Sequence, residues 1–125
     1  LGGLLLVAGL AACGAAYAHG EPWREALLAY LRQNRARVVQ AVAGWPGMEM
    51  VAPEATYLAW IDLRPLGTDE QALQQVLIEQ QKVAIMPGST YGDAGAGFLR
   101  LNVGCPRSKV EEGLKRLIAG IRALS

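Results

Sequence analysis

The sequence has few of the residues that build metal sites and disulfide frameworks. It contains one histidine, His19, and two cysteines, Cys13 and Cys105, which lie far apart. These three residues form no zinc-ligand spacing, so we expect no metal-binding residues. A single cysteine pair cannot supply a disulfide framework, and we expect two reduced thiols. This cysteine usage is compatible with a cytoplasmic protein.

Charge is also scarce. Charged residues make up 18% of the 125 positions and the formal net charge is +1, whereas about a quarter of an average domain is charged. A nucleic-acid or anionic-membrane partner normally needs a basic excess, so we expect neither. The length fits one domain. Because 52% of the residues are hydrophobic, some apolar surface is expected to contact another domain or subunit.

The first twenty residues are apolar and uncharged, and they imitate a targeting signal. Leu10-Ala11-Ala12-Cys13 has the pattern of a lipoprotein processing site. The segment lacks the initiating Met and the basic residues of a secretory signal, and it is short for a membrane span. We therefore favour a buried helix over residues 1–20. The missing Met leads us to expect a piece of a longer protein.

The hydrophobic pattern predicts a two-layer α/β (α+β) sandwich, with a small, mainly antiparallel sheet packed against helices. The 56–62 strand is apolar on both faces, so it is predicted to be central and Trp60 to be in the core. Capping boxes are expected at Thr68 with Gln71 and at Ser108 with Glu111. Beyond residue 20, the predicted helices are 21–44, 68–81 and one from 108 on, and the predicted strands are 48–51, 56–62, 83–86 and 98–103.

A flexible glycine-rich loop from Met86 to Gly97 leads into the last predicted strand. A period of two places Leu99, Leu101 and Val103 on one face and Phe98, Arg100 and Asn102 on the other. From the residues alone, Arg100 has two interpretations. It is either on a solvated face or in a structural ion pair, or it binds a substrate carboxylate through two parallel hydrogen bonds.

The sequence contains no complete catalytic constellation. The nucleophile motif G-x-S-x-G does not occur, and the glycines of the loop do not match the dinucleotide fingerprint. The three lysines, Lys82, Lys109 and Lys115, are in polar contexts, whereas a Schiff-base lysine needs a desolvated pocket. We therefore predict no catalytic and no cofactor-binding residue in this chain.

Three separated stretches nevertheless resemble a known family. They are Ala15 to Trp23, Pro53 to Asp62, and Gly97 to Asn102 followed by Cys105-Pro106-Arg107. They look like the C-terminal part of the MalY/PatB group of cystathionine β-lyases. That group belongs to the fold-type I pyridoxal-5′-phosphate (PLP) enzymes, the aspartate aminotransferase superfamily.

The resemblance implies a PLP-dependent carbon–sulfur β-lyase that converts an L-cysteine conjugate into a thiol, pyruvate and ammonia. Residues 21–125 would be its C-terminal small domain, and residues 1–20 a connecting helix toward an N-terminal PLP-binding domain. It further implies a cytoplasmic homodimer in which Arg100 binds the substrate α-carboxylate. The family's Schiff-base lysine and its cofactor-binding residues have no counterpart here, so this chain alone is expected to be inactive without bound PLP.

Two alternatives stay open at this point. The second candidate is the same small domain from a class I/II aminotransferase, because the superfamily shares the arginine. A stand-alone amino-acid-binding or regulatory module would instead bind an amino acid without any further domain.

Overall fold

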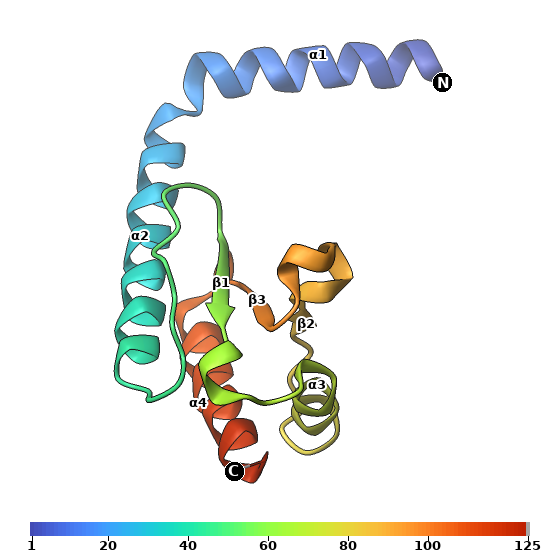
Figure 1. Ribbon diagram of the computed structural model, residues 1–125. Coiled ribbons are helices and arrows are strands. Elements are labelled where there is room, and N and C mark those ends of the chain that lie inside the picture. The colour runs from blue at the N-terminus through green and yellow to red at the C-terminus, as the bar shows by residue number, and fades with distance from the viewer. Residues whose placement is uncertain (125) are drawn as a thin grey trace. The chain divides into compact units, whose positions relative to one another are not determined.

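The computed structural model describes residues 1–124, which form four α-helices, three short strands and three 3₁₀ turns (Figure 1). Contacts divide the chain into two units, Leu1–Arg32 and Gln33 to the C-terminus. In chain order the elements are α1 (Gly2–His19), α2 (Glu21–Ala43), β1 (Leu58–Asp62), η1 (Arg64–Leu66), α3 (Glu70–Glu79), β2 (Met86–Pro87), η2 (Gly88–Tyr91), η3 (Asp93–Gly95), β3 (Phe98–Asn102) and α4 (Arg107–Leu124).

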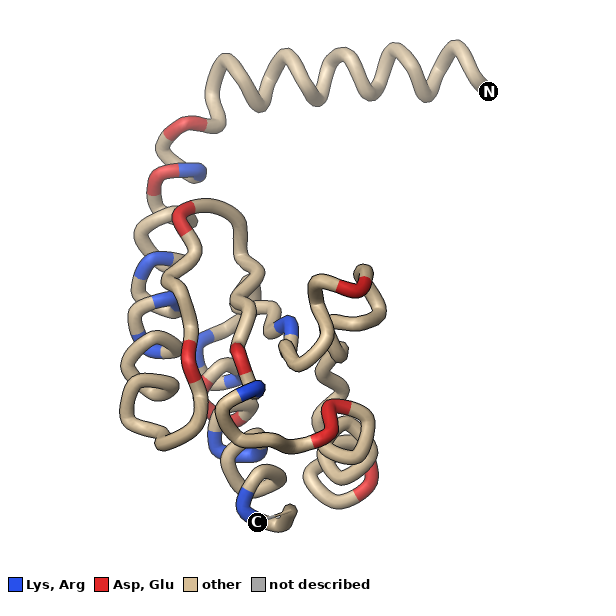
Figure 2. Tube along the Cα trace, viewed as in Figure 1, with Lys and Arg blue, Asp and Glu red and all other residues tan. Residues whose placement is uncertain are grey.

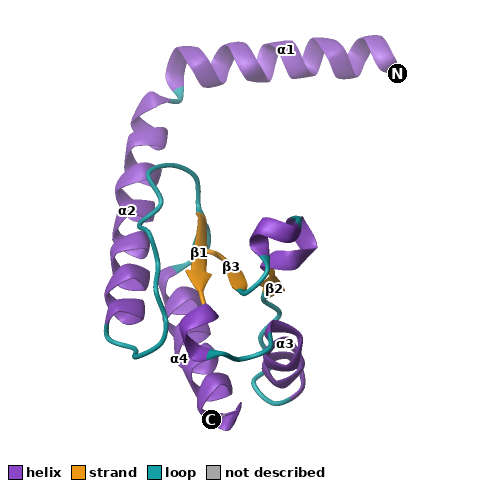
Figure 3. Ribbon diagram, viewed as in Figure 1, coloured by secondary structure: helices purple, strands orange, loops and turns teal. Residues whose placement is uncertain are grey.

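The sheet is antiparallel and has the order β1-β3-β2. The central strand is thus β3, and the prediction of a central strand at 56–62 is wrong. The predicted strand at 48–51 is also wrong, because Glu49 and Asp62 form an isolated bridge and the segment is otherwise loop (Figure 3). The Pro53 carbonyl accepts a hydrogen bond of 2.9 Å from Arg35 Nη1, which ties this loop to α2.

The core lies between one face of the sheet and three helices. Ala59 and Ile61 on β1, and Leu99 on β3, are buried at alternate positions, as a period of two requires. The helices meet them with Val38 and Val42 from α2, Leu73 and Leu77 from α3, and Val110, Leu114, Leu117 and Ile121 from α4. This arrangement confirms the two-layer α/β sandwich and leaves the other face of the sheet uncovered by these helices.

Both predicted capping boxes differ from the observed helix starts. The N-cap of α3 is Asp69, whose Oδ1 accepts a hydrogen bond of 3.0 Å from the Gln71 amide. In α4 the Pro106 carbonyl already accepts from the Lys109 amide at 2.8 Å, so the helix begins at Arg107. Ser108 therefore lies inside the helix, where its side chain cannot act as the N-cap.

Helix α1 carries no Asp, Glu, Lys or Arg, as Figure 2 shows, and none of its residues is buried. By length and composition alone it is apolar enough to cross a membrane, a test that signal sequences and buried core helices also pass. Within residues 1–124 no other segment covers Leu4, Leu5 or Leu10, which are 65–71% exposed. Burial of this helix against another domain stays a prediction.

Asn34 is the buried polar side chain of the described core, with no exposed surface. Its Nδ2 donates hydrogen bonds of 3.0 Å to the carbonyls of Val103 and Cys105, just after β3. One amide of α2 therefore fixes the chain where it leaves the central strand. Because buried carbonyls need donors, this side chain matters more to stability than its size indicates.

We predict that Asn34→Ala lowers the free energy of unfolding by about 1–3 kcal/mol, because two carbonyls lose their side-chain donor. Denaturant unfolding followed by circular dichroism measures the effect. Gln40→Ala, an exposed substitution on the same helix, is the matched control and should change stability by less than about 0.5 kcal/mol. Equal effects of the two substitutions would contradict the role given to Asn34.

Candidate functional site

The candidate site lies on the sheet face opposite the core. In the antiparallel register Arg100 on β3 is opposite Trp60 on β1 and Met86 on β2, and Phe98 is opposite Asp62. Residues opposite one another in a sheet share a face. The predicted alternation of β3 is confirmed, because Leu99 is buried whereas Arg100 is partly exposed.

Arg100 is held by an aromatic ring. Its guanidinium carbon lies 3.9 Å from the ring centroid of Tyr91, which comes from η2. Among residues 1–124, no carboxylate forms a salt bridge with Arg100. The structural ion pair, one of the two interpretations of this arginine, is therefore not found in the described part of the chain.

A second arginine near this face, Arg64, behaves differently. Its Nε and Nη2 donate to the two carboxylate oxygens of Asp62 at 2.9 and 2.7 Å, and its own amide donates to Asp62 Oδ1 at 2.9 Å. Hydrogen bonding from the Arg64 side chain lowers the pKa of the Asp62 carboxyl. Arg64 is thus matched by a local anion, whereas Arg100 has none among residues 1–124.

Aromatic side chains surround the two arginines. Trp60 contacts Tyr91 and Phe98 edge to face, with ring centroids 5.8 and 6.4 Å apart. Trp60 was predicted in the core; it faces away because Ala59 and Ile61, its neighbours on β1, point inward. The sequence analysis assigned neither Trp60 nor Tyr91 to the site. For Tyr91, the presence of an aromatic residue inside a glycine-rich loop could have indicated a site residue.

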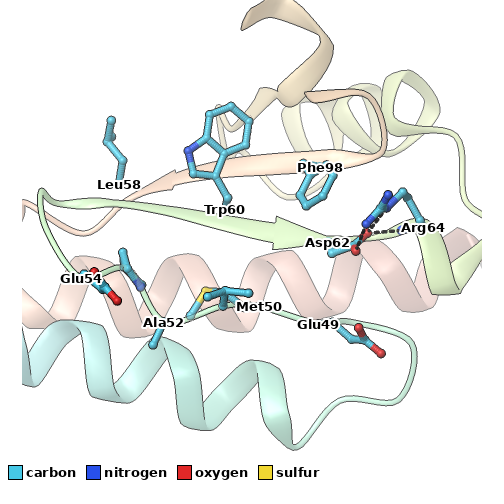
Figure 4. Close-up of a pocket in the computed structure, with 11 residues that line it drawn as sticks. Glu49, Met50, Ala52, Glu54, Leu58, Trp60, Asp62, Arg64 and Phe98 are labelled. Atoms are coloured by element: carbon cyan, nitrogen blue, oxygen red, sulfur yellow. Dashed lines mark hydrogen bonds and ion pairs between the residues drawn. The ribbon is translucent and has the colours of Figure 1, made fainter. Parts of the chain in front are cut away.

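Two hollows flank the Trp60–Phe98 pair. One, of about 370 Å³, is lined by Trp60, Tyr91, Ala94, Gly95 and Phe98. The other, of about 530 Å³, lies along β1 and reaches the Asp62–Arg64 ion pair (Figure 4). Figure 4 shows the segment from Glu49 to Glu54 running beside β1 as the other wall of this hollow.

Backbone contacts anchor the glycine-rich loop at both ends. A Cβ on Gly88 would lie 2.1 Å from the Gly95 carbonyl oxygen, so the two ends of the loop touch through their backbones. Gly97, at φ +83°, donates to Glu70 Oε2 at 3.0 Å and accepts from the Leu63 amide at 2.9 Å. These contacts fix the loop that presents Tyr91.

We predict that Gly88→Ala destabilises the protein by several times the cost of an ordinary surface substitution, because the new methyl group meets backbone and not a movable side chain. Thermal unfolding measures the change. Gly113→Ala is the matched control, because Gly113 lies in α4 and no atom is within 4 Å of the new methyl group. Replacing a glycine inside a helix should raise the free energy of unfolding by about 0.5–1 kcal/mol. Opposite signs are expected for the two variants.

The described residues do not by themselves fit PLP. Lys82, Lys109 and Lys115 are all exposed, and Lys82 Nζ donates to the Glu79 carbonyl at 2.6 Å. None occupies the desolvated pocket that lowers a lysine pKa for Schiff-base chemistry. Residues 1–124 also contain no group of three or more His, Cys, Asp or Glu side chains that could hold a metal ion. Within residues 1–124 the site consists of the Arg100 guanidinium, which has no carboxylate partner there, beside an aromatic hollow.

Known proteins are similar to this chain in sequence and in fold. Residues 5–117 match the family described as aminotransferase class I and II. The chain is 55% identical to protein MalY of Escherichia coli K12 over 88% of its own length and 28% of that protein. It is 37% identical to cystathionine beta-lyase PatB of Bacillus subtilis 168, over 97% of this chain and 31% of PatB.

A solved structure agrees with the sequence matches. Cystalysin from Treponema denticola, which contains a pyridoxal 5′-phosphate cofactor, superposes with a TM-score of 0.85 at 30% identity. The match covers 94% of this chain and 30% of cystalysin. The chain therefore spans less than a third of the length of each of these three relatives.

Proposed function

Because this chain belongs to the aminotransferase class I and II family, we propose that it is the substrate-carboxylate part of a PLP-dependent carbon–sulfur β-lyase. The proposed substrate is an L-cysteine conjugate such as cystathionine, and the products are a thiol, pyruvate and ammonia. The names of PatB, a cystathionine beta-lyase, and of other relatives called cystathionine beta-lyase support this choice.

The observation that carries the proposal is the state of Arg100. Its guanidinium is on the open face of the sheet, lies over the Tyr91 ring, and has no carboxylate partner among residues 1–124. A planar fork of N–H donors matches a carboxylate through two parallel hydrogen bonds. We therefore assign to Arg100 the substrate α-carboxylate.

In the proposed whole enzyme, this chain binds the substrate and another domain binds PLP, because no lysine of this chain fits Schiff-base chemistry. PLP, when bound, supplies an electron sink for the bonds at the α-carbon of the amino acid. We propose that residues 21–125 are a small domain, that residues 1–20 lead to a PLP-binding domain outside this chain, and that the lysine comes from there. A cytoplasmic homodimer is the matching assembly. Within the chain, Arg100 orients the substrate and the rings of Trp60 and Phe98 keep water from its apolar part.

We predict that Arg100→Lys in the full-length enzyme lowers kcat/KM by about 10- to 100-fold, because lysine cannot reproduce the two-bond fork and a charged hydrogen bond contributes roughly 1.5–3 kcal/mol. Steady-state pyruvate release measures it. Arg122→Lys is the matched control: that guanidinium also stacks on a ring, at 4.8 Å from the Trp45 centroid, but is on α4. An Arg100→Lys enzyme as active as the control would reject the assignment.

A class I/II aminotransferase is the second candidate, favoured by the description of the matched family. The two activities differ in product. The lyase releases pyruvate from an L-cysteine conjugate without a second substrate, whereas an aminotransferase needs a keto acid to accept the amino group.

We expect the full-length protein to release pyruvate and ammonia from cystathionine in the absence of any keto acid. Turnover that depends strictly on an added keto acid would favour the aminotransferase instead. The isolated chain is the control. It is expected to release no pyruvate and to show no PLP absorbance band, and amino-acid binding by this chain alone in calorimetry would favour a stand-alone module.

A further inference from the structure

We propose that Tyr91 is a positioning residue, which holds the guanidinium plane of Arg100 so that its N–H edge faces the substrate carboxylate. This inference rests on the proposed function, because it needs Arg100 to bind that carboxylate. It assigns to the glycine-rich loop the task of presenting one aromatic ring to the arginine.

The geometry of the contact carries the proposal. The Arg100 guanidinium carbon lies 3.9 Å from the Tyr91 ring centroid, well within the 6 Å range of a cation–π contact. We infer that the guanidinium presents its face to the ring, as in the stacked form of this contact. The N–H donors lie along its edge, so they stay available for a carboxylate. A holding ion pair would instead occupy those donors, as Asp62 does with two of the donors of Arg64.

Tyr91 is itself held in place. Its ring meets Trp60 edge to face at 5.8 Å and 79°, and Trp60 is opposite Arg100 in the sheet register. The backbone contact of Gly88 with Gly95 closes the loop that carries Tyr91. Because Tyr91 is 45% exposed, its packing into the core is limited, and a role in stability alone accounts poorly for this construction.

The test compares two substrates in the full-length enzyme: an S-alkyl-L-cysteine and its α-carboxamide. The ratio of kcat/KM for the carboxylate substrate to kcat/KM for the carboxamide reports recognition of the carboxylate. Partial unfolding of a variant lowers both values equally and leaves this ratio unchanged. Tyr91→Leu keeps apolar bulk and removes the ring. We expect it to lower this ratio by about 3- to 30-fold, mainly through KM, in line with the energy of a cation–π contact.

Two control variants accompany Tyr91→Leu. Tyr91→Phe keeps the ring and should stay within about twofold of the parent enzyme, because the ring face supplies the attraction. Ile78→Ala changes a side chain on α3 that is 46% exposed and is not on the sheet, and it should leave the ratio unchanged. An equal loss in Tyr91→Phe and Tyr91→Leu would overturn the role of the ring.

The double variant separates this inference from the proposed function. In an Arg100→Ala background, Tyr91→Leu should have no further effect on the ratio, because it acts through the arginine. If Arg100→Ala itself leaves the ratio unchanged, the carboxylate assignment fails. Two outcomes would keep Arg100 as the carboxylate ligand and reject the positioning role of Tyr91. In both, Arg100→Ala abolishes the preference for the carboxylate substrate. In the first, Tyr91→Leu does not lower the ratio; in the second, it lowers the ratio equally with and without the arginine.

Discussion

The pairing of β3 with β1 and β2 determines which side chains lie in the core and which lie on the face of the candidate site. One register places Leu99 in the core and Arg100 opposite Trp60 and Met86. Since side chains alternate between faces, a slip of one residue would move the arginine into the core and the leucine into the open. Burial of Leu99 therefore secures the position of Arg100, and Asn34 fixes the chain just beyond the strand.

The two arginines of the site show how local partners decide the task of a side chain. Arg64 lies against Asp62, which is two residues earlier in the sequence. Its backbone amide, Nε and Nη2 all donate hydrogen bonds to the Asp62 carboxylate. An arginine whose donors are occupied in this way contributes little to binding another anion. Arg100 has an aromatic partner in place of an acidic one, so its position is restrained while its charge stays uncompensated within residues 1–124.

The sequence predicted the parts of this arrangement that depend on local pattern. The alternation along β3 and the helix over residues 21–44 follow directly from periods of 2 and 3.6. The order of the strands did not, because the sheet order depends on pairing partners distant in the chain. The prediction that Trp60 lies in the core was wrong because both faces of its strand are apolar, which is typical of a strand covered on both sides. One of these faces instead carries aromatic side chains that line two hollows. The period of two identified Arg100 as a candidate, and the family resemblance favoured carboxylate binding over a structural role.

An uncompensated guanidinium on an apolar face has a cost, and that cost indicates what the site is for. Partial burial weakens hydration of the charge, and neither Trp60 nor Phe98 returns a hydrogen bond. A cation–π contact recovers part of this loss but leaves the donors along the guanidinium edge unmatched by any acid of the described chain. A bound carboxylate would satisfy both the charge and two donors at once. The unmatched donors of Arg100 therefore support the proposal that this side chain binds the carboxylate of an amino-acid substrate.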